Sequence, residues 1–135
     1  MHLEYVGIRV TNLKRSLKFY TELLDLKEVG KGDFTKYEAG IWLKLKEDEK
    51  SGQHLELNWY PKGSHFDVPH VACEGLDHIR FAVDNIEETY KKLLEKGAEP
   101  KPIDHSLTEG WVAHVKDPDG NWIEIFKIPL SQAAK

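Results

Sequence analysis

The sequence predicts an α+β fold made of two βαβββ modules that are related by internal duplication. An alternating stretch at residues 3–10 is followed by a helical pattern, and the same succession begins again at residues 76–83. Strand-like stretches at residues 54–59 and 121–128 close the two halves at equivalent places. Alternating apolar residues indicate half-buried strands, and apolar residues three or four apart indicate a helix with one buried face. Repeats of this length are supersecondary units that pack on one another.

The first half continues from its opening strand into a capped helix. Thr11 or Asn12 can cap this helix, because either side chain can accept from its first free backbone N–H groups. The apolar stripe starts at Leu13, and the helix ends near Asp25. Beyond it we expect a short strand at residues 26–29, two short strands within residues 34–45 around Ala39-Gly40, and a charged turn at residues 47–52.

The second half repeats this plan. Asn85 is placed like Asn12, and an apolar stripe covers residues 86–93. Gly97 is a natural helix C-cap, because glycine adopts the left-handed backbone conformation without steric cost. A strand is expected at residues 111–116. The predicted boundaries are a first module at 1–60, a linker at 61–75, a second module at 76–130 and a frayed tail at 131–135.

Composition narrows the class of protein. At 135 residues the chain is one domain, or two small halves that share a core. The net charge is -4 with both signs mixed, so neither nucleic acid nor an anionic membrane is expected as a partner. Cys73 is the only cysteine, which excludes an intrachain disulfide and favours a reducing interior. We find no signal-peptide pattern or membrane-span pattern and expect a soluble cytoplasmic protein.

The first candidate functional residue is Glu124. The segment 117–120 reads Asp-Pro-Asp-Gly, which is the composition of a type I turn. In the strand that follows, Glu124 lies between Trp122 and Phe126 on the face opposite two isoleucines. A carboxylate is rarely buried beside aromatic rings unless another group compensates its charge.

The duplication indicates which residues correspond to one another. Tyr5 corresponds to His78 on the first strands, and Glu56 corresponds to Glu124 on the last strands. If the two sheets curl toward each other, these side chains meet in one cleft, whereas a slip of one residue would turn them to the helix side. His54 lies about 7 Å from Glu56 on the same face and can join the cleft. The other residues expected to line it and contact substrate are Arg9, Asn58, Arg80, Trp122 and Phe126.

Two carboxylates and an imidazole suit a divalent metal, such as zinc, nickel, manganese, cobalt or ferrous iron. Such a metal could hold a carbonyl and an adjacent hydroxyl and stabilise an enediolate, while Glu124 or Glu56 moves a proton on carbon. A simpler interpretation is also open: Arg9 and Arg80 can pair with the glutamates and form a charged cleft without metal. The histidines expected in turns or on the surface are His65, His70, His105 and His114.

Six motifs are spread along essentially the whole chain: Val-Gly-Ile-Arg-Val at 6–10, Arg-Ser-Leu-Lys-Phe-Tyr at 15–20, Leu-Glu-Leu at 55–57, Asp-His-Ile at 77–79, Val-Asp-Asn at 83–85 and Asp-Pro-Asp-Gly-Asn-Trp-Ile-Glu-Ile at 117–125. In this order and spacing they resemble the vicinal oxygen chelate superfamily, and within it the glyoxalase I-like branch. The resemblance implies a cupped mixed sheet around a metal, with helices outside. It implies Glu124 as the proton-transferring base and Arg9 as a contact for glutathione. The metal ligands it implies are Tyr5, Glu56, His78 and Glu124.

Two positions depart from the glyoxalase I pattern. That branch has His or Gln where this chain has Tyr5, and a neutral phenol is a weak ligand for these metals. It has a glutathione-binding asparagine where this chain has Tyr60, and Asn58 comes two residues too early. The expected function is a metal-dependent lyase or isomerase of glyoxalase I type, acting by proton transfer on a small oxygenated substrate such as a 2-oxoaldehyde thiol adduct.

Three alternative functions stay open. A metal-free small-molecule-binding protein of the bleomycin resistance type is favoured by Tyr5 and by three aromatic side chains that can stack on a planar ligand, namely Trp59, Trp122 and Phe126. An extradiol-type dioxygenase would use ferrous iron and a second histidine. An acyl-CoA epimerase is the third alternative. The resemblance also implies a possible homodimer.

Overall fold

The computed structural model describes residues 1, 3–37, 40–50, 52–64 and 76–128. The chain divides into two compact units, Met1–Val71 and Ala72–Lys135. Most of the expected linker, at 65–75, and the expected tail at 131–135 lie outside the described residues. No helix in the described part of the chain is long and apolar enough to cross a membrane.

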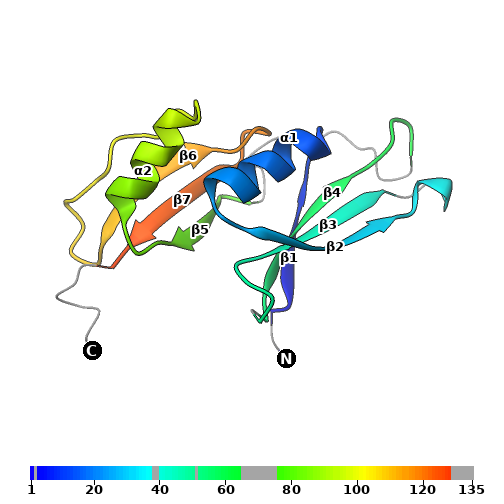
Figure 1. The fold of residues 1–135 in the computed structure, drawn as a ribbon, viewed down its shortest axis with the longest axis horizontal. Coiled ribbons are helices and arrows are strands. Elements are labelled where there is room, and N and C mark those ends of the chain that lie inside the picture. Colours follow the sequence, from blue (N-terminus) through cyan, green and yellow to red (C-terminus); the bar gives the residue numbers. More distant parts are fainter. Residues whose placement is uncertain (2, 38–39, 51, 65–75, 129–135) are drawn as a thin grey trace. The chain divides into compact units, whose positions relative to one another are not determined.

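The first unit is a four-stranded sheet with one helical segment on it (Figure 1). The strands lie in the order β1-β4-β3-β2, with β1 parallel to β4 and the other pairs antiparallel. A short α-helix runs directly into a π-helical turn, and the α-helix contacts β4. The elements are β1 (Tyr5–Arg9), α1 (Leu13–Lys18), η1 (Phe19–Leu23), β2 (Lys27–Asp33), η2 (Thr35–Tyr37), β3 (Ile41–Lys46) and β4 (His54–Trp59).

The second unit repeats this arrangement with a three-stranded sheet in the order β5-β7-β6. Its first strand is again parallel to its last strand. Where the first unit has β2, the second unit has an isolated bridge between Asp104 and Val112. Pro100 and Pro102 have no backbone N–H group to donate, which limits regular pairing beside β6. The elements are β5 (His78–Ala82), α2 (Ile86–Glu95), β6 (Trp111–Lys116) and β7 (Trp122–Lys127).

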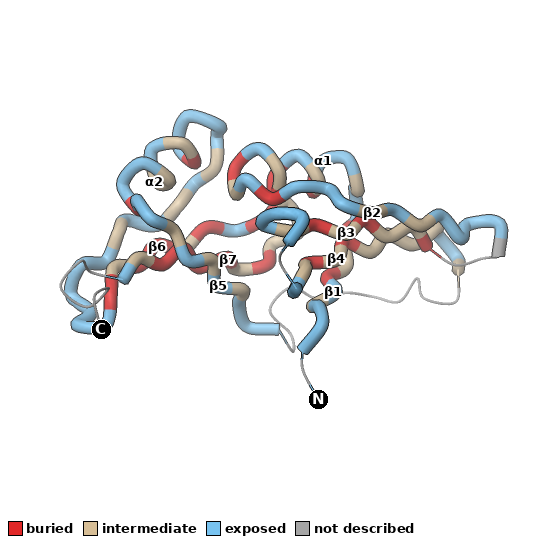
Figure 2. Tube along the Cα trace, turned by 60° about the horizontal axis from the view of Figure 1, so that its bottom comes forward, coloured by how far each residue is buried: buried red, intermediate tan, exposed pale blue. Residues whose placement is uncertain are grey.

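Each unit has its own apolar core, formed where the helix covers one face of the sheet. Burial follows the alternation of the sequence: Leu55 and Leu57 are buried in β4, and Ile123 and Ile125 in β7. The buried positions therefore concentrate along the central strands (Figure 2). Full burial of one such side chain stabilises a fold by about 1.5–3 kcal/mol.

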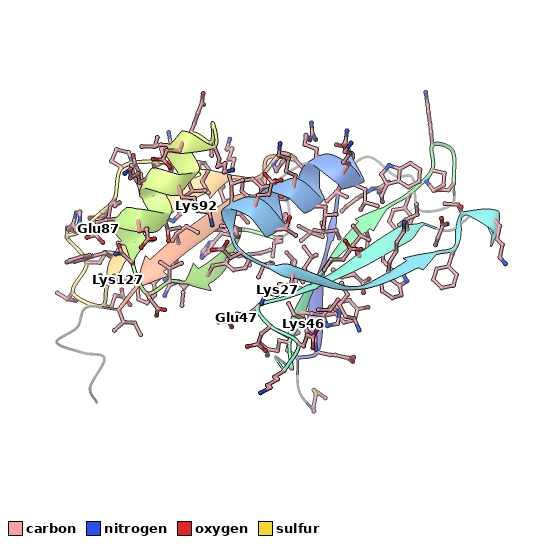
Figure 3. All side chains as sticks on the ribbon, viewed as in Figure 1. Lys27, Lys46, Glu47, Glu87, Lys92 and Lys127 are labelled. Carbon is pink, nitrogen blue, oxygen red and sulfur yellow. The ribbon has the colours of Figure 1, made fainter. Side chains whose placement is uncertain are left out.

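The predicted helix ends are confirmed. Asn12 and Asn85 each accept, through Oδ1, the backbone N–H three residues ahead, at 2.9 and 3.0 Å. Gly97 has φ of 82° and ends α2 in a Schellman motif, in which Ala98 N–H donates to the carbonyl of Leu93. An ion pair also joins this helix to its sheet, because Lys127 Nζ of β7 lies 3.9 Å from Glu87 Oε2 of α2 (Figure 3).

One strand of the first unit is longer than predicted, and one predicted strand is absent from the described residues. The strand expected at 26–29 extends to Asp33, because Gly30 and Gly32 leave room for side chains of β3, including the indole of Trp42. The first of the two strands expected in residues 34–45 is instead the 3₁₀ turn η2. Here Asp33 Oδ1 accepts from both the backbone N–H and the hydroxyl of Thr35, at 3.0 and 2.7 Å, and this local turn diverts the chain.

Strand pairing confirms the internal correspondence inferred from the sequence. Glu56 lies opposite Gly7, and Glu124 lies opposite Arg80. Tyr5 lies two positions before Gly7 on β1, and His78 lies two positions before Arg80 on β5. Tyr5 and His78 therefore occupy equivalent places on their strands.

Candidate functional site

The turn that precedes β7 holds the hairpin in register. Asp117 Oδ1 accepts from the backbone N–H groups of Asp119 and Asn121, at 2.9 and 2.8 Å, and its Oδ2 accepts from the Asn121 side chain. Gly120 N–H donates to the Asp117 carbonyl, and Gly120 has φ of 85°, which favours glycine. The resulting hairpin places His114 of β6 directly opposite Glu124 of β7.

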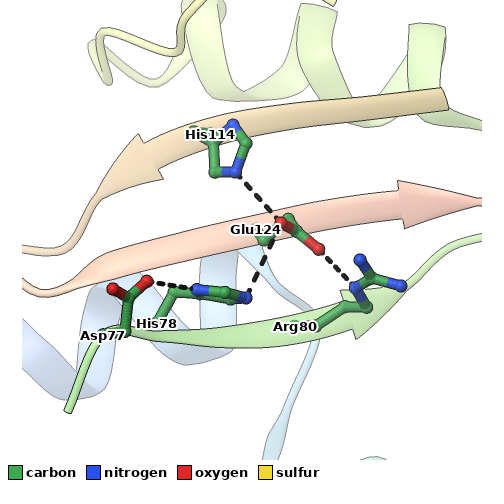
Figure 4. A network of polar contacts seen from close by, with 5 residues as sticks. All are labelled: Asp77, His78, Arg80, His114 and Glu124. Carbon is green, nitrogen blue, oxygen red and sulfur yellow. Dashed lines mark hydrogen bonds and ion pairs between the residues drawn. The ribbon is translucent and has the colours of Figure 1, made fainter. Parts of the chain in front are cut away.

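Glu124 is a buried carboxylate that three side chains approach (Figure 4). Its Oε1 accepts a hydrogen bond from Arg80 Nε. Its Oε2 lies 3.0 Å from His114 Nε2 and 3.7 Å from His78 Nε2. The expected compensation of the buried charge is thus provided within the second unit by the Arg80 guanidinium on one oxygen, while two imidazoles approach the other oxygen.

His78 is oriented by the residue before it. Asp77 Oδ1 lies 2.6 Å from His78 Nδ1, so a proton on Nδ1 is donated to this carboxylate (Figure 4). With the proton on Nδ1, Nε2 carries a free lone pair and faces Glu124. Carboxylates hold metal-binding histidines in this way, fixing both the tautomer and the ring direction.

A pocket of about 270 Å³ opens beside this cluster. Its size is close to the lower limit for small-ligand sites in proteins, which begin at roughly 300 Å³. It combines imidazoles, an ammonium group and an indole face. The residues that line it are Asp77, His78, Lys101, His114 and Trp122.

Three residues of this cluster and pocket were not predicted as site residues from the sequence: His114, Asp77 and Lys101. His114 was expected in a turn or on the surface, but it lies in β6 and contacts Glu124. A signal was available, because a hairpin around the turn at 117–120 that pairs residue 116 with 122 also pairs 114 with 124. Asp77 stood in a recognised motif beside His78, and nothing in the sequence pointed to Lys101.

The first unit brings together Tyr5, His54 and Glu56. The Tyr5 and His54 rings are stacked, with centroids 4.7 Å apart and planes at 19°. His54 Nε2 lies 3.7 Å from Glu56 Oε2 and has no hydrogen-bond partner, although the His54 side chain is only 4% exposed. Burial lowers the pKa of His54, and the charge of Lys44 lowers it further, against the opposing effect of Glu56.

The other expected substrate contacts lie on the same strands, with specific neighbours. Arg9 lies over the ring of Tyr60, at 5.3 Å from its centroid, and Arg80 lies over Phe126, at 4.2 Å. Asn58 donates from Nδ2 to the backbone carbonyl of Glu56 at 3.4 Å. The remaining expected contact, Trp122, lines the pocket of the second unit.

Both units offer imidazole–carboxylate pairs whose chemistry fits a divalent metal. The His54–Glu56 and His78–Glu124 pairs each have their donor atoms 3.7 Å apart. Zinc binds such nitrogen and oxygen atoms at about 2.0–2.2 Å, so one ion can touch donors up to about 4.2 Å apart. In the part of the chain that the structure describes, no three His, Cys, Asp or Glu side chains form a ready metal cluster. The first unit thus supplies the His54–Glu56 pair, and the second supplies Glu124 with His78 and His114 beside it.

This fold, with a carboxylate and an imidazole on the face of each sheet opposite its helix, defines a protein of the vicinal oxygen chelate class. The chain matches the Glyoxalase/Bleomycin resistance protein/Dioxygenase superfamily over residues 2–125 and belongs to it.

Within the superfamily the chain is glyoxalase I-like. It is 33% identical to a probable lactoylglutathione lyase of Synechocystis, over 94% of this chain and 95% of that protein. Glyoxalase I of Leishmania major, described as trypanothione-dependent, superimposes with a TM-score of 0.74 at 29% identity, covering 94% of this chain and 86% of that one. An antibiotic-binding protein from a Streptomyces species shares the fold at 18% identity and a TM-score of 0.74, covering 96% and 97%.

Proposed function

We propose that this protein is a metal-dependent lyase or isomerase of glyoxalase I type. Its substrate would be a small 2-oxoaldehyde thiol adduct, on which a proton moves between neighbouring carbons. The observation that carries the proposal is the environment of Glu124, a buried carboxylate whose Oε2 faces the Nε2 atoms of His78 and His114. The likeness to proteins named lactoylglutathione lyase, over nearly their full length, supports the same reaction class.

The metal donors in this proposal are Glu56, His78 and Glu124, with Tyr5 as a weak ligand at most. When bound, a divalent metal would act as a Lewis acid toward the carbonyl and hydroxyl oxygens of the substrate. Asp77 keeps the His78 imidazole in the tautomer that such a role requires. Zinc, nickel, manganese and cobalt all accept this donor chemistry.

Glu124 is the proposed base, and Glu56 is the alternative. Glu124 takes the proton from one carbon of the substrate and returns it to the neighbouring carbon. Arg80 holds Oε1 of Glu124, which fixes the direction of the carboxylate before substrate enters. Arg80 and Arg9 provide positive charge for an anionic substrate, and Asn58, Trp122 and Phe126 provide polar and aromatic contacts.

A second candidate is a metal-free small-molecule-binding protein. It is favoured by Tyr5 at a position where the glyoxalase I pattern has His or Gln, and by the indole of Trp122 at the pocket. An aromatic face of this kind stacks on planar ligands.

The deciding experiment measures metal content by plasma mass spectrometry on untagged wild-type protein and on His78→Ala. The same samples are assayed for thioester formation from the adduct of methylglyoxal with glutathione, and with a second thiol. About one metal per chain, lost in the variant together with turnover, is the expected result. No metal after incubation with zinc, nickel, manganese and cobalt, and no turnover, would overturn the proposal in favour of the binding protein. Gel filtration with light scattering on the same samples tests the expected homodimer.

A further inference from the structure

We infer that His54 supplies, through Nε2, the nitrogen metal ligand of the first module, and that Tyr5 orients this imidazole instead of binding metal itself. The inference rests on the proposed metal-dependent function and adds a ligand to it. It assigns His54 a role different from the substrate contact expected for it from the sequence.

The first argument is the state of the His54 side chain. Its exposed fraction is 4%, and Nε2 is buried without a hydrogen-bond partner. Buried polar atoms are nearly always paired, so an unpaired one calls for an explanation such as an ion or a catalytic role. In the tautomer with the proton on Nδ1, the Nε2 lone pair is a suitable donor for a divalent metal.

The second argument is the distance to Glu56. Nε2 of His54 and Oε2 of Glu56 are 3.7 Å apart, which exceeds a hydrogen bond but lies within the span of two ligands of one ion. The two residues alternate on β4, so both side chains emerge from the same face of the sheet. The His78–Glu124 pair of the second module has the same atom types at the same separation.

The third argument is the position of Tyr5. Tyr5 lies opposite His54 in the β1–β4 pairing, and its ring is stacked on the imidazole at 4.7 Å. A flat stack holds the imidazole plane and shields one face of it from solvent. The module thus keeps an imidazole nitrogen beside Glu56 although its first strand has a phenol.

The direct test is nuclear magnetic resonance of wild-type protein labelled with ¹⁵N-histidine and titrated with Zn²⁺. The expected result is that His54 Nε2 shifts to a value typical of metal-bound nitrogen at saturating Zn²⁺, as His78 Nε2 does. A His54 signal that stays unchanged while His78 shifts would overturn this inference and leave the proposed function standing. No shift at either histidine would overturn both this inference and the proposed metal-dependent function.

An independent test compares the Zn²⁺ affinities of three variants with that of the wild type, each measured by competition with a chelator. His54→Gln is expected to lose at least about tenfold, since even outer-shell partners of a metal site contribute that much. Tyr5→Phe keeps the stacked ring and is expected to bind Zn²⁺ as the wild type does. His105→Gln is the control, because His105 is exposed and contacts the ring of Trp111 in the other module. Wild-type affinity in His54→Gln, or a matching loss in Tyr5→Phe, would refute the assignment. Circular dichroism spectra establish that each variant is folded.

Discussion

Replacement of Glu124 by glutamine tests the proposed base most directly. The amide keeps the size of the side chain but cannot accept a proton from carbon. It also removes the charge that Arg80, His78 and His114 approach. Measuring both stability and turnover of this variant separates the chemical role of the carboxylate from its role in the fold.

The expected effect on stability is moderate. A hydrogen bond to a charged group contributes about 1.5–3 kcal/mol, but the Arg80 side chain is 48% exposed and regains water when its partner is lost. We expect the free energy of unfolding to fall by about 1–2 kcal/mol, which a domain stable by roughly 5–15 kcal/mol tolerates. Urea denaturation measures this change.

The expected effect on turnover is larger. Loss of a positioned base lowers rates by about 10²–10⁴-fold, which corresponds to about 2.7–5.4 kcal/mol of activation free energy. The assay is thioester formation from the glutathione–methylglyoxal adduct, with metal content measured on the same sample. We expect kcat to fall at least about 100-fold, while metal content falls less because other donors remain.

The matched control is Glu95→Gln on α2. Glu95 is exposed and pairs only loosely with Lys91, at 3.8 Å, so its replacement should leave turnover unchanged. A Glu124→Gln protein that turns over substrate at the wild-type rate would refute the assignment of Glu124 as base. Equal losses in both variants would show that the assay reports general damage to the fold.

Three further predictions concern the scaffold. Leu57→Ala removes a fully buried side chain from the middle of β4 and should cost about 2–5 kcal/mol in urea denaturation; a loss below about 1 kcal/mol would contradict its place in the core. Asn85→Ala removes the cap that accepts from Glu88 N–H and should cost about 0.5–2 kcal/mol, whereas Asn85→Asp should retain most of the stability. Ser106→Ala should raise the pKa of Asp104 toward its ordinary range, since the Ser106 hydroxyl is the main cause of its depression. Because the folded-state pKa of Asp104 is depressed, the wild type should be more stable than Ser106→Ala above the unfolded pKa of about 3.9, and this difference should vanish as pH falls through the folded pKa. A nuclear magnetic resonance titration that finds the pKa of Asp104 unchanged in the variant would refute this prediction.

Much of the scaffold could be predicted because its signals are local. The alternation in 54–59 identifies β4 and its buried leucines, and Asn12 and Asn85 are recognisable as caps by their position before apolar stripes. The turn at 117–120 is also local, since each of its hydrogen bonds joins residues at most four positions apart. The 3₁₀ turn after Asp33 was missed because two hydrogen bonds from Thr35 to the Asp33 side chain outweigh a strand-like composition.

The candidate site was predictable only in part. The resemblance of its motifs pointed to the family, while alternation and duplication predicted the equivalent strand positions of Glu56 and Glu124 and the equivalence of Tyr5 with His78. The pairing of Arg80 with Glu124, one of the alternatives from the sequence, is present. The contact of His114 with Glu124 and the burial of His54 Nε2 without a hydrogen-bond partner came only from the folded structure. Those facts depend on which strands lie side by side and on the direction of each side chain. Both are set by pairing between residues distant in the chain, which no local pattern specifies.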